Sequence, residues 1–353
     1  MKNPLVTVFM PVYNGQRYIR ESVESILTQT FKDFELLIVD DASTDKSVRI
    51  IESFNDTRIR LVKNKKHLGL AKIRQKGVDL AKGKYIAFLD CDDIALPQRL
   101  SKHVSYLDSH KEVYVAGSWV EIIDEQGKKT GQVWRHAESP ELIKAILLFR
   151  NCISQSSVLL RKECFNAEHY RADNWPAPDY DLWIRLAGKF KMINIPAVLT
   201  YYRKHPQNMS GDAKKEIDDC TTKIMKENLG RLDINVLPQE VRIHRLLEPG
   251  QQNLSLQEIK AIEKWLLKLS DCNRNIGRYD IDLFDRLLKG YWFKVCLGNS
   301  YNGMKVFERY RLSMLSRNTR WGIAKQFFLS LFCFFRKSRL VDITAYEMTK
   351  YFI

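Results

Sequence analysis

Residues 85–93 read YIAFLDCDD, an apolar run that ends in the acids Asp90, Asp92 and Asp93. The run Tyr85–Leu89 predicts a buried strand. Acidic side chains at the end of such a strand cost free energy unless something positive lies beside them. The simplest candidate is a hard divalent cation that shares its shell with waters or phosphates. A solvated acidic loop or a helix N-cap explains the same acids, and this stretch alone does not decide between the explanations.

Strand and helix patterns alternate through the first 90 residues. Apolar runs typical of strands occur at residues 6–10, 34–39, 59–62 and 85–89, and helical patterns occur at residues 18–30, 47–54 and 70–82. This order indicates an α/β fold with an open, doubly wound and mainly parallel sheet. Ligands of such sheets bind outside the carboxyl ends of the strands. Polar clusters follow three of these ends, at Pro11–Gly15, Asp40-Asp41 and Asp90–Asp93.

The pattern changes along the rest of the chain. Between residues 100 and 200 we expect strands at residues 113–124, 156–160 and 197–203 and helices at residues 140–149 and 181–189. After residue 210 the pattern is mainly helical, and Ser255 with Glu258 forms a capping-box pattern at the start of a helix. We therefore expect an α/β domain over residues 1–210 and a mainly helical region over residues 211–353.

Composition and charge narrow the class of protein. A hydrophobic content of 45% excludes a disordered chain, and 353 residues suffice for an α/β domain with a smaller one. The formal net charge of +15 indicates an acidic partner, which leaves nucleic acid, anionic lipid and phosphorylated substrates open. Seven cysteines without a CxxC pair indicate reduced thiols in a cytoplasmic protein. We expect neither a signal peptide nor a membrane-spanning helix, which needs about 20 apolar residues.

The strand ends lack the common nucleotide-binding signatures. No GxGxxG motif follows the first strand and no GxxxxGK[ST] motif occurs, which disfavours a dinucleotide oxidoreductase and a P-loop NTPase. Asp41 can accept the N–H of a nucleotide base such as uracil. Alternatively, Asp40 and Asp41 cap the helix that follows them.

Two residues farther along the chain are candidates for chemistry. Asp179 can act as a general base if it reaches a substrate hydroxyl, although its spacing alone favours a helix N-cap. Asp181 directly precedes an apolar helix and is the better candidate for the N-cap, which leaves Asp179 available for chemistry. His205 follows a strand. A lone histidine is a candidate metal ligand only where a metal site otherwise lacks one ligand.

Seven stretches together resemble the family 2 glycosyltransferases of the GT-A fold. In chain order they are PVYNG (11–15), SILTQTF (25–31), FELLIVDDASTD (34–45), AKGKYIAFLDCDD (81–93), PQRL (97–100), DYDLWIRL (179–186) and YRKH (202–205). They follow the order of the family and cover residues 1–210. The resemblance implies a GT-A catalytic domain for this part of the chain.

The resemblance also implies roles for individual residues. A nucleotide-sugar site would be formed by Pro11, Val12, Tyr13, Asn14, Asp40, Asp41, Arg74, Asp90, Cys91 and Asp92. Within it, Asp41 would hold the base. A metal ion, Mg²⁺ or Mn²⁺, would be bound mainly by Asp92, with His205 and Asp90 as further ligands. Asp179 matches the second residue of the Glu-Asp pair that supplies the catalytic base.

The chain departs from the family pattern at three places. Pro178 replaces the glutamate of the Glu-Asp pair, Ile73-Arg74-Gln75 replaces Ala-Arg-Asn, and Gln155 stands where relatives often have histidine. None of these changes removes the inferred base or metal ligand. The last two leave the fine contacts to donor or acceptor open.

The implied reaction moves a sugar from a nucleoside-diphosphate sugar, with UDP as the default nucleotide, to an acceptor hydroxyl with inversion. Bacterial cell-surface polysaccharide or lipid-linked glycan synthesis would use such an enzyme. Two other classes stay open, a sugar-nucleotide nucleotidyltransferase and a sugar-nucleotide-binding protein without activity. We expect no nucleic-acid partner, because the positive charge lies away from the acidic clusters and no nucleic-acid-binding motif occurs.

The end of the chain carries a basic and aromatic segment. Between Tyr291 and Leu340 ten basic residues accompany the single acid Glu308. The apolar stretch Trp321–Phe335 lies within this segment and is too short to span a bilayer. It predicts an interfacial helix on an anionic membrane surface, at the inner face of the cell membrane; the alternative is a core helix of the C-terminal region.

Overall fold

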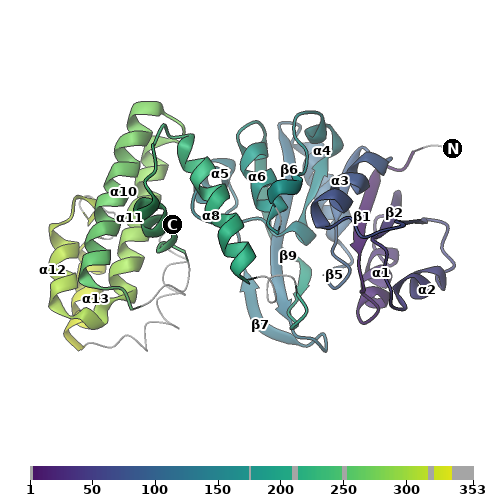
Figure 1. Cartoon of the computed structure of the whole chain (residues 1–353), viewed down its shortest axis with the longest axis horizontal. Helices are drawn as coiled ribbons and strands as arrows, with labels where there is room; N and C mark the ends of the chain where they lie inside the picture. The colour runs from purple at the N-terminus through teal and green to yellow at the C-terminus, as the bar shows by residue number, and fades with distance from the viewer. Residues whose placement is uncertain (1–2, 175, 209–213, 249–252, 317–321, 336–353) are drawn as a thin grey trace. The chain divides into compact units, whose positions relative to one another are not determined.

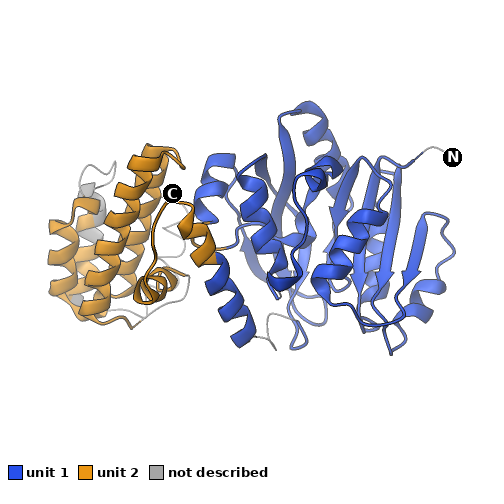
Figure 2. Cartoon of the chain, turned by 45° about the horizontal axis from the view of Figure 1, so that its top comes forward, with its two compact units in different colours: residues 1–147, 151–224 blue, residues 148–150, 225–353 orange. Residues whose placement is uncertain are grey.

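The computed structural model of the chain describes residues 3–174, 176–208, 214–248, 253–316 and 322–335 (Figure 1). It divides into two compact units, unit 1 with residues 1–147 and 151–224 and unit 2 with residues 148–150 and 225–353 (Figure 2). The expected boundary at residue 210 lies outside the described residues and stays a prediction.

Unit 1 contains a nine-stranded sheet. Its strands are β1 (Val6–Val12), β2 (Phe34–Asp40), β3 (Ile59–Lys63), β4 (Tyr85–Phe88), β5 (Ile94–Ala95), β6 (Val113–Ile123), β7 (Lys129–Trp134), β8 (Leu159–Arg161) and β9 (Lys191–Arg203). The strand order is β3-β2-β1-β4-β8-β6-β9-β5, with β7 paired to β6. Strands β3, β2, β1 and β4 are parallel, as expected, whereas β8 is antiparallel to both of its neighbours.

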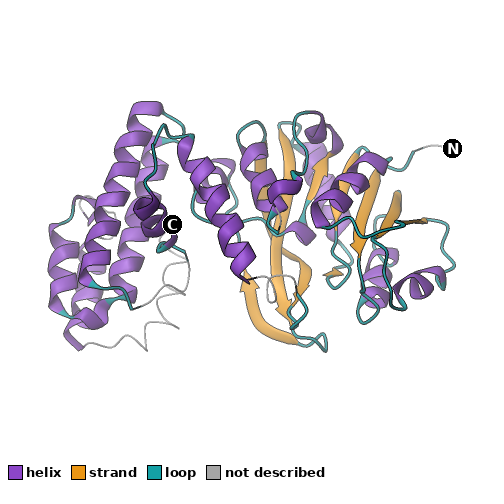
Figure 3. Cartoon of the chain, viewed as in Figure 1, coloured by secondary structure: helices purple, strands orange, loops and turns teal. Residues whose placement is uncertain are grey.

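Helices of unit 1 accompany these strands, as Figure 3 shows. They are α1 (Ile19–Leu27), α2 (Ser47–Glu52), α3 (Leu70–Leu80), α4 (Arg99–Ser109), α5 (Pro140–Ile146) and α6 (Pro178–Ala187), with short 3-10 helices at Gln155–Ser157, Lys162–Asn166 and Ala172–Asn174. Helix α8 (Lys214–Gly230) begins in unit 1 and ends in unit 2. The expected α/β class is therefore confirmed.

Strand β1 is covered on both faces. Val6 and Val8 belong to a core that includes residues of α1 and α4, whereas Phe9 points to the opposite face and meets α3. A Cβ at Gly77 of α3 would lie 2.2 Å from Cε2 of Phe9, so only glycine allows this close approach. The same packing fixes the place of Arg74, which lies one turn earlier in α3.

The register of the sheet brings the carboxyl ends of β1, β2 and β4 together. Val12 pairs with Asp40, and Phe9 pairs with Phe88. The amide of Asp41 donates to the carbonyl of Val12 at 2.7 Å. The polar clusters that the sequence places after these strands therefore meet at one edge of the sheet.

Unit 2 is helical throughout its described elements. These are α9 (Pro238–Arg245), α10 (Leu256–Ile276), α11 (Ile281–Gly298), α12 (Met304–Leu312) and α13 (Gly322–Phe335), with 3-10 helices at Ser300–Asn302 and Met314–Ser316. The capping box is confirmed at the start of α10, where the Glu258 amide donates to the Ser255 hydroxyl at 3.2 Å. Residues 148–150 belong to this unit, and Phe149 stacks on His244 and packs against Tyr291 with a ring separation of 4.4 Å.

Helix α13 carries the aromatic stretch of the sequence. Its Leu329 and Cys333 are buried in unit 2, whereas Phe334 on another face is 72% exposed. The alternative of a core helix therefore has buried residues in α13, and the expected contact with a membrane surface stays a prediction. Within the described ranges, no helix has the length and apolarity to cross a membrane. All seven cysteines are free thiols, as expected.

Candidate active site

The loops after β1 and β2 are tied to each other. Asn14 and Ala42 adopt positive φ angles of 52° and 65°, a region that non-glycine residues seldom occupy. The Asn14 amide donates to the Ser43 hydroxyl at 2.9 Å, and Asn14 Oδ1 accepts the Thr44 amide at 2.8 Å. These contacts hold the predicted nucleotide loop in a strained but fixed shape.

Asp41, directly after β2, is 1% exposed. Its carboxylate accepts the side-chain amide of Asn64 at 2.7 Å and the backbone amides of Leu68 and Gly69 at 3.0 Å. His67 Nδ1 lies 2.9 Å from Oδ2 of the same carboxylate. Asp41 therefore anchors the loop that precedes α3, a contact that the sequence did not reveal. Its expected contact with a nucleotide base stays a prediction.

The alternative that Asp40 and Asp41 cap the next helix is wrong. Helix α2 has Lys46 at its N-cap position without a side-chain cap. Asp40 instead accepts the amide of Ser43 at 3.2 Å within the loop. Tyr13, directly after β1, is 49% exposed and its ring lies 4.2 Å from that of His67. Pro11 and Val12 continue β1 into this region.

Arg74 links two of the acidic candidates. Its side chain is 6% exposed, with Nη2 3.5 Å from Asp90 Oδ1 and Nη1 3.9 Å from Asp179 Oδ1. Burial raises the pKa of Asp90, and the charges of Asp92 and Asp179 add to this effect while Arg74 opposes it. The amide of Asp90 donates to the hydroxyl of Ser156 at 3.1 Å. A buried cation thus joins the end of β4 to the start of α6.

Asp92 and His205 form a second pair. His205 Nε2 lies 3.0 Å from Asp92 Oδ2, and the side-chain amide of Asn208 lies 3.3 Å from the same oxygen. The ring of Tyr18 packs on His205 at 4.7 Å. Cys91 lies between the acids as a half-buried thiol, and burial raises its pKa well above the ordinary value.

Arg203 binds the segment that carries these acids. Its amide donates to Asp93 Oδ1 at 2.9 Å, and its guanidinium donates to the carbonyl of Asp92 at 2.9 Å and to Glu21 at 2.6 Å. Asp93 is buried, and this burial raises its pKa well above the ordinary value. Because Arg203 is two residues before His205, it ties the acidic loop to the end of β9.

A divalent cation at this place would have to take much of its shell from a substrate and from water. The described residues contain no group of three His, Cys, Asp or Glu side chains that could hold a metal ion. Asp92 and His205 nevertheless converge, and Mg²⁺ commonly takes one or two carboxylates together with phosphates and waters. His205 Nδ1 is buried without a hydrogen-bond partner among the described residues. Asp90 faces Arg74, so its role as a further ligand stays a prediction.

Asp179 lies in the first turn of α6, where its side chain is 22% exposed. The N-cap residue of this helix is Ala177, without a side-chain cap. The expectation that Asp181 caps the helix is therefore wrong. Asp181 lies inside the first turn and binds Arg185 at 2.8 Å.

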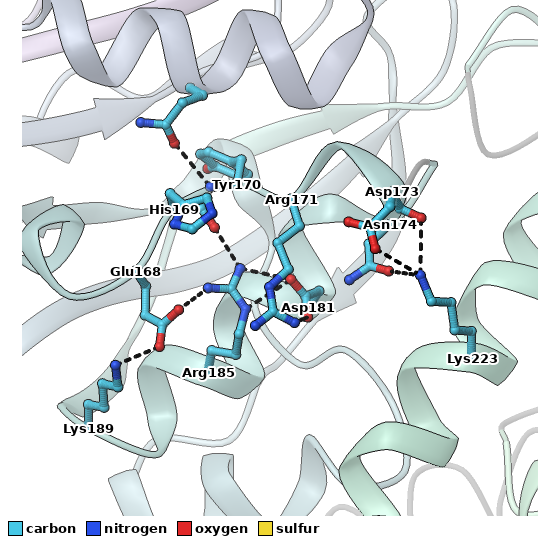
Figure 4. Close-up of polar contacts among 11 residues, drawn as sticks. Glu168, His169, Tyr170, Arg171, Asp173, Asn174, Asp181, Arg185, Lys189 and Lys223 are labelled. Atoms are coloured by element: carbon cyan, nitrogen blue, oxygen red, sulfur yellow. Dashed lines mark hydrogen bonds and ion pairs between the residues drawn. The ribbon is translucent and has the colours of Figure 1, made fainter.

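A network of ion pairs secures the segment before α6 (Figure 4). Arg185 binds Asp181, Glu168 and the carbonyl of His169, and Lys189 binds Glu168 at 2.8 Å. Further contacts come from the other helices: Gln75 Oε1 accepts the amide of Tyr170 at 3.0 Å, and Lys223 binds Asp173 at 3.1 Å. This network fixes the direction in which α6 presents Asp179.

Sequence reasoning missed several residues of the site. Asn151 donates to Asp179 at 3.1 Å, and Gln155 donates to the buried hydroxyl of Tyr170 at 2.9 Å. Neither Asn151 nor Tyr170 stands in a recognisable motif. Only the fold brings Asn151 to Asp179 and Tyr170 to the neighbourhood of Arg74. Gln155 was singled out only as a departure from the family pattern.

Comparisons with known proteins identify the family of the chain. The family model described as "Glycosyl transferase family 2" matches residues 7–171. An uncharacterized glycosyltransferase of Haemophilus influenzae is 32% identical over 238 residues, which cover 64% of this chain and 73% of that protein. The Escherichia coli protein named UDP-Glc:alpha-D-GlcNAc-diphosphoundecaprenol beta-1,3-glucosyltransferase WfaP is 33% identical over 215 residues, covering 60% of this chain and 82% of that one.

Among solved structures, residues 1–349 of S. aureus TarS in complex with UDP-GlcNAc match with a TM-score of 0.55. The match covers 96% of this chain and 92% of that one at 17% identity, so it shows the fold alone. Together with the relatives above, it confirms the expected GT-A class of α/β fold with a helical C-terminal region. The chain belongs to glycosyl transferase family 2.

Proposed function

We propose that this glycosyltransferase moves a sugar from a nucleoside-diphosphate sugar, UDP-sugar being the first candidate, to a hydroxyl group of a lipid-linked glycan. The observation that carries the proposal is the convergence of Asp90, Asp92 and Asp179 with Arg74 and His205 at the carboxyl ends of the strands. Two Escherichia coli relatives are named for UDP-Glc and a diphosphoundecaprenol-linked acceptor, which supports both substrate classes.

Asp179 is the proposed general base. Its carboxylate takes the proton of the acceptor hydroxyl while that oxygen forms a bond to the anomeric carbon. The bond from the anomeric carbon to the diphosphate oxygen breaks at the same time, and the nucleoside diphosphate leaves with the electron pair. A single displacement inverts the anomeric configuration and requires no covalent intermediate.

Asp92 and His205 would hold the divalent cation, Mg²⁺ or Mn²⁺, with Asp90 beside them. When bound, the cation would neutralise charge on the diphosphate. Arg74 contributes a fixed positive charge, because it is buried between Asp90 and Asp179. Tyr13, exposed at the end of β1, offers a ring on which a base can stack.

We further propose a peripheral position on the cytoplasmic face of an anionic membrane. Leu312, the last residue of α12, and Met314, two residues after it, are 63% and 60% exposed. Arg311 lies beside Leu312, whereas Arg309 of the same helix is paired with Glu263. Exposed apolar residues beside an arginine favour contact with acidic lipid.

A vesicle-pelleting comparison tests the membrane contact. The full chain should pellet with phosphatidylglycerol vesicles and less with phosphatidylcholine vesicles. The variant Leu312→Glu with Met314→Glu should lose most of this difference. Equal pelleting of the two proteins on acidic vesicles would contradict the proposed contact surface.

A donor screen tests the reaction. Wild-type protein with Mn²⁺ is offered UDP-, GDP- and dTDP-sugars together with diphosphoundecaprenol-linked acceptors, and the released nucleotide and the extended lipid are measured. Release of nucleoside diphosphate with a longer glycan supports the proposal. Release of pyrophosphate from a nucleoside triphosphate and a sugar phosphate would indicate a nucleotidyltransferase. Donor binding without turnover across the whole screen would indicate a binding protein.

A further inference from the structure

Among the described residues, Asn151 is the one that makes a side-chain hydrogen bond to Asp179. Arg74 also approaches the Asp179 carboxylate, but not to hydrogen-bond distance. Asn151 Nδ2 donates to Asp179 Oδ2 at 3.1 Å. Its Oδ1 accepts the backbone amide of Ile153 at 3.0 Å. Because a backbone N–H can only donate, Oδ1 must face Ile153 and the donating Nδ2 must face Asp179. The direction of the bond is therefore set by the fold.

The backbone around Asn151 is well anchored. Cys152 and Ile153, which follow it, are 1% and 2% exposed. The carbonyl of Cys152 accepts the side-chain amide of Asn194 at 3.3 Å. Because its backbone is anchored in this way, the Asn151 amide group can hold the Asp179 carboxylate in one place better than a side chain on an open loop could.

Arg74 is the competitor for the same carboxylate. Its Nη1 lies 3.9 Å from Asp179 Oδ1, which is longer than a hydrogen bond. Nε and Nη1 of Arg74 have no hydrogen-bond partner in the part of the chain that the structure describes. A freely rotating Asp179 would gain charge-assisted hydrogen bonds by closing onto this guanidinium. Such a closed pair would withdraw the carboxylate from an acceptor hydroxyl.

We propose that Asn151 is a positioning residue that keeps the Asp179 carboxylate from closing to hydrogen-bond distance of Arg74 and so leaves Oδ1 able to accept the proton of the acceptor hydroxyl. This inference rests on the proposed function, because it assigns a role for the general base of that reaction. Asn151 itself acts only through Asp179.

A purely structural role for Asn151 uses a different atom. The turn from Asn151 to Ile153 needs only Oδ1 as an acceptor, whereas positioning needs Nδ2 as a donor. Asn151→Asp keeps an oxygen for Ile153 and replaces the donor with a second oxygen that repels Asp179. Asn151→Ser keeps an acceptor for the turn and adds no charge, but its side chain is too short to reach Asp179.

The experiment measures kcat, the donor KM and thermal unfolding for wild-type protein and both variants. We expect kcat to fall about 10²-fold in each, since small misplacements of catalytic groups cost about that much, with donor KM and unfolding temperature near wild type. Asn166→Asp, which adds the same charge at an exposed position of unit 1, should match wild type. Asn151→Asp adds a charge and Asn151→Ser does not, so a loss of kcat in both variants cannot be due to the added charge alone.

A double-mutant cycle separates positioning from a direct role. In an Asp179→Asn background, Asn151→Ser should cause no further loss, because the residue through which Asn151 acts is already gone. A kcat within twofold of wild type in both single variants, or an equal further loss in the Asp179→Asn background, would overturn the inference. Wild-type protein that turns over no donor would instead overturn the proposed function, and the inference with it.

Discussion

Replacing Arg185 by methionine removes the cation at the centre of the network in Figure 4. Arg185 is 3% exposed and donates twice to Asp181 Oδ2, at 2.9 and 2.8 Å, as well as to Glu168 and to the carbonyl of His169 at 2.7 Å. Methionine fills a similar volume but leaves these acceptors without their partner. Loss of one member of a buried pair costs about 3–5 kcal/mol.

The remaining contacts place Arg185→Met at the low end of this range. Asp181 keeps Arg171 at 3.8 Å, and Glu168 keeps Lys189 at 2.8 Å, so neither acid is wholly unpaired. We therefore expect a loss of about 3 kcal/mol in the free energy of unfolding. For a unit of this size that corresponds to a fall in Tm of about 6–12 °C.

Thermal unfolding followed by tryptophan fluorescence measures this effect, because Trp183 in α6 is fully buried. The matched control is Lys189→Met, which removes a half-exposed partner of Glu168 and should lower Tm by only about 0–4 °C. Since the network orients α6, the Arg185 variant should also lose glycosyl transfer more strongly than donor binding. An unchanged Tm in Arg185→Met would refute the reasoning about the network.

Three further predictions address packing, pH and metal binding. Gly77→Ala should lower stability by about 1–3 kcal/mol in urea unfolding, because its Cβ would meet Phe9; an unchanged midpoint would contradict the close packing. Burial raises the pKa of Glu35, but its hydrogen bonds outweigh burial and lower the pKa overall. Glu35 therefore stabilises the fold above a pH of about 4.3, and this stabilisation is lost as the pH falls through the pKa of the folded state. Glu35→Gln should therefore flatten the acid limb of a Tm–pH curve, and an unchanged limb would exclude this role. Asp92→Asn or His205→Ala should reduce the Tm increase that Mn²⁺ with UDP gives, and full retention in both would exclude them as ligands.

The first half of the fold was predictable because its signals are local. Buried apolar runs define β1, β2 and β4, and their register is fixed by packing on both faces. Strand β8 was harder, since Gln155–Ser157 forms a 3-10 turn and the strand starts only at Leu159. Periodicity does not distinguish a short apolar turn from the strand that follows it.

The site was predictable where residues stand in motifs and not where they act through distant contacts. Asp92 and His205 were expected together, and the structure brings them within 3.0 Å. Asp181 was misread as a cap because its partner, Arg185, lies one turn ahead and looks from sequence like an ordinary surface cation. The link from Asn151 to Asp179 spans 28 residues and depends on how two loops meet, which no local pattern encodes.

The most direct test of the central claim is the turnover of Asp179→Asn with a donor and acceptor that the wild-type protein uses. We predict that glycosyl transfer falls about 10²–10⁴-fold, while calorimetry shows wild-type affinity for the nucleoside-diphosphate sugar and the Tm stays unchanged. Near-wild-type transfer by a folded Asp179→Asn protein would contradict the assignment of Asp179 as the base and the mechanism built on it.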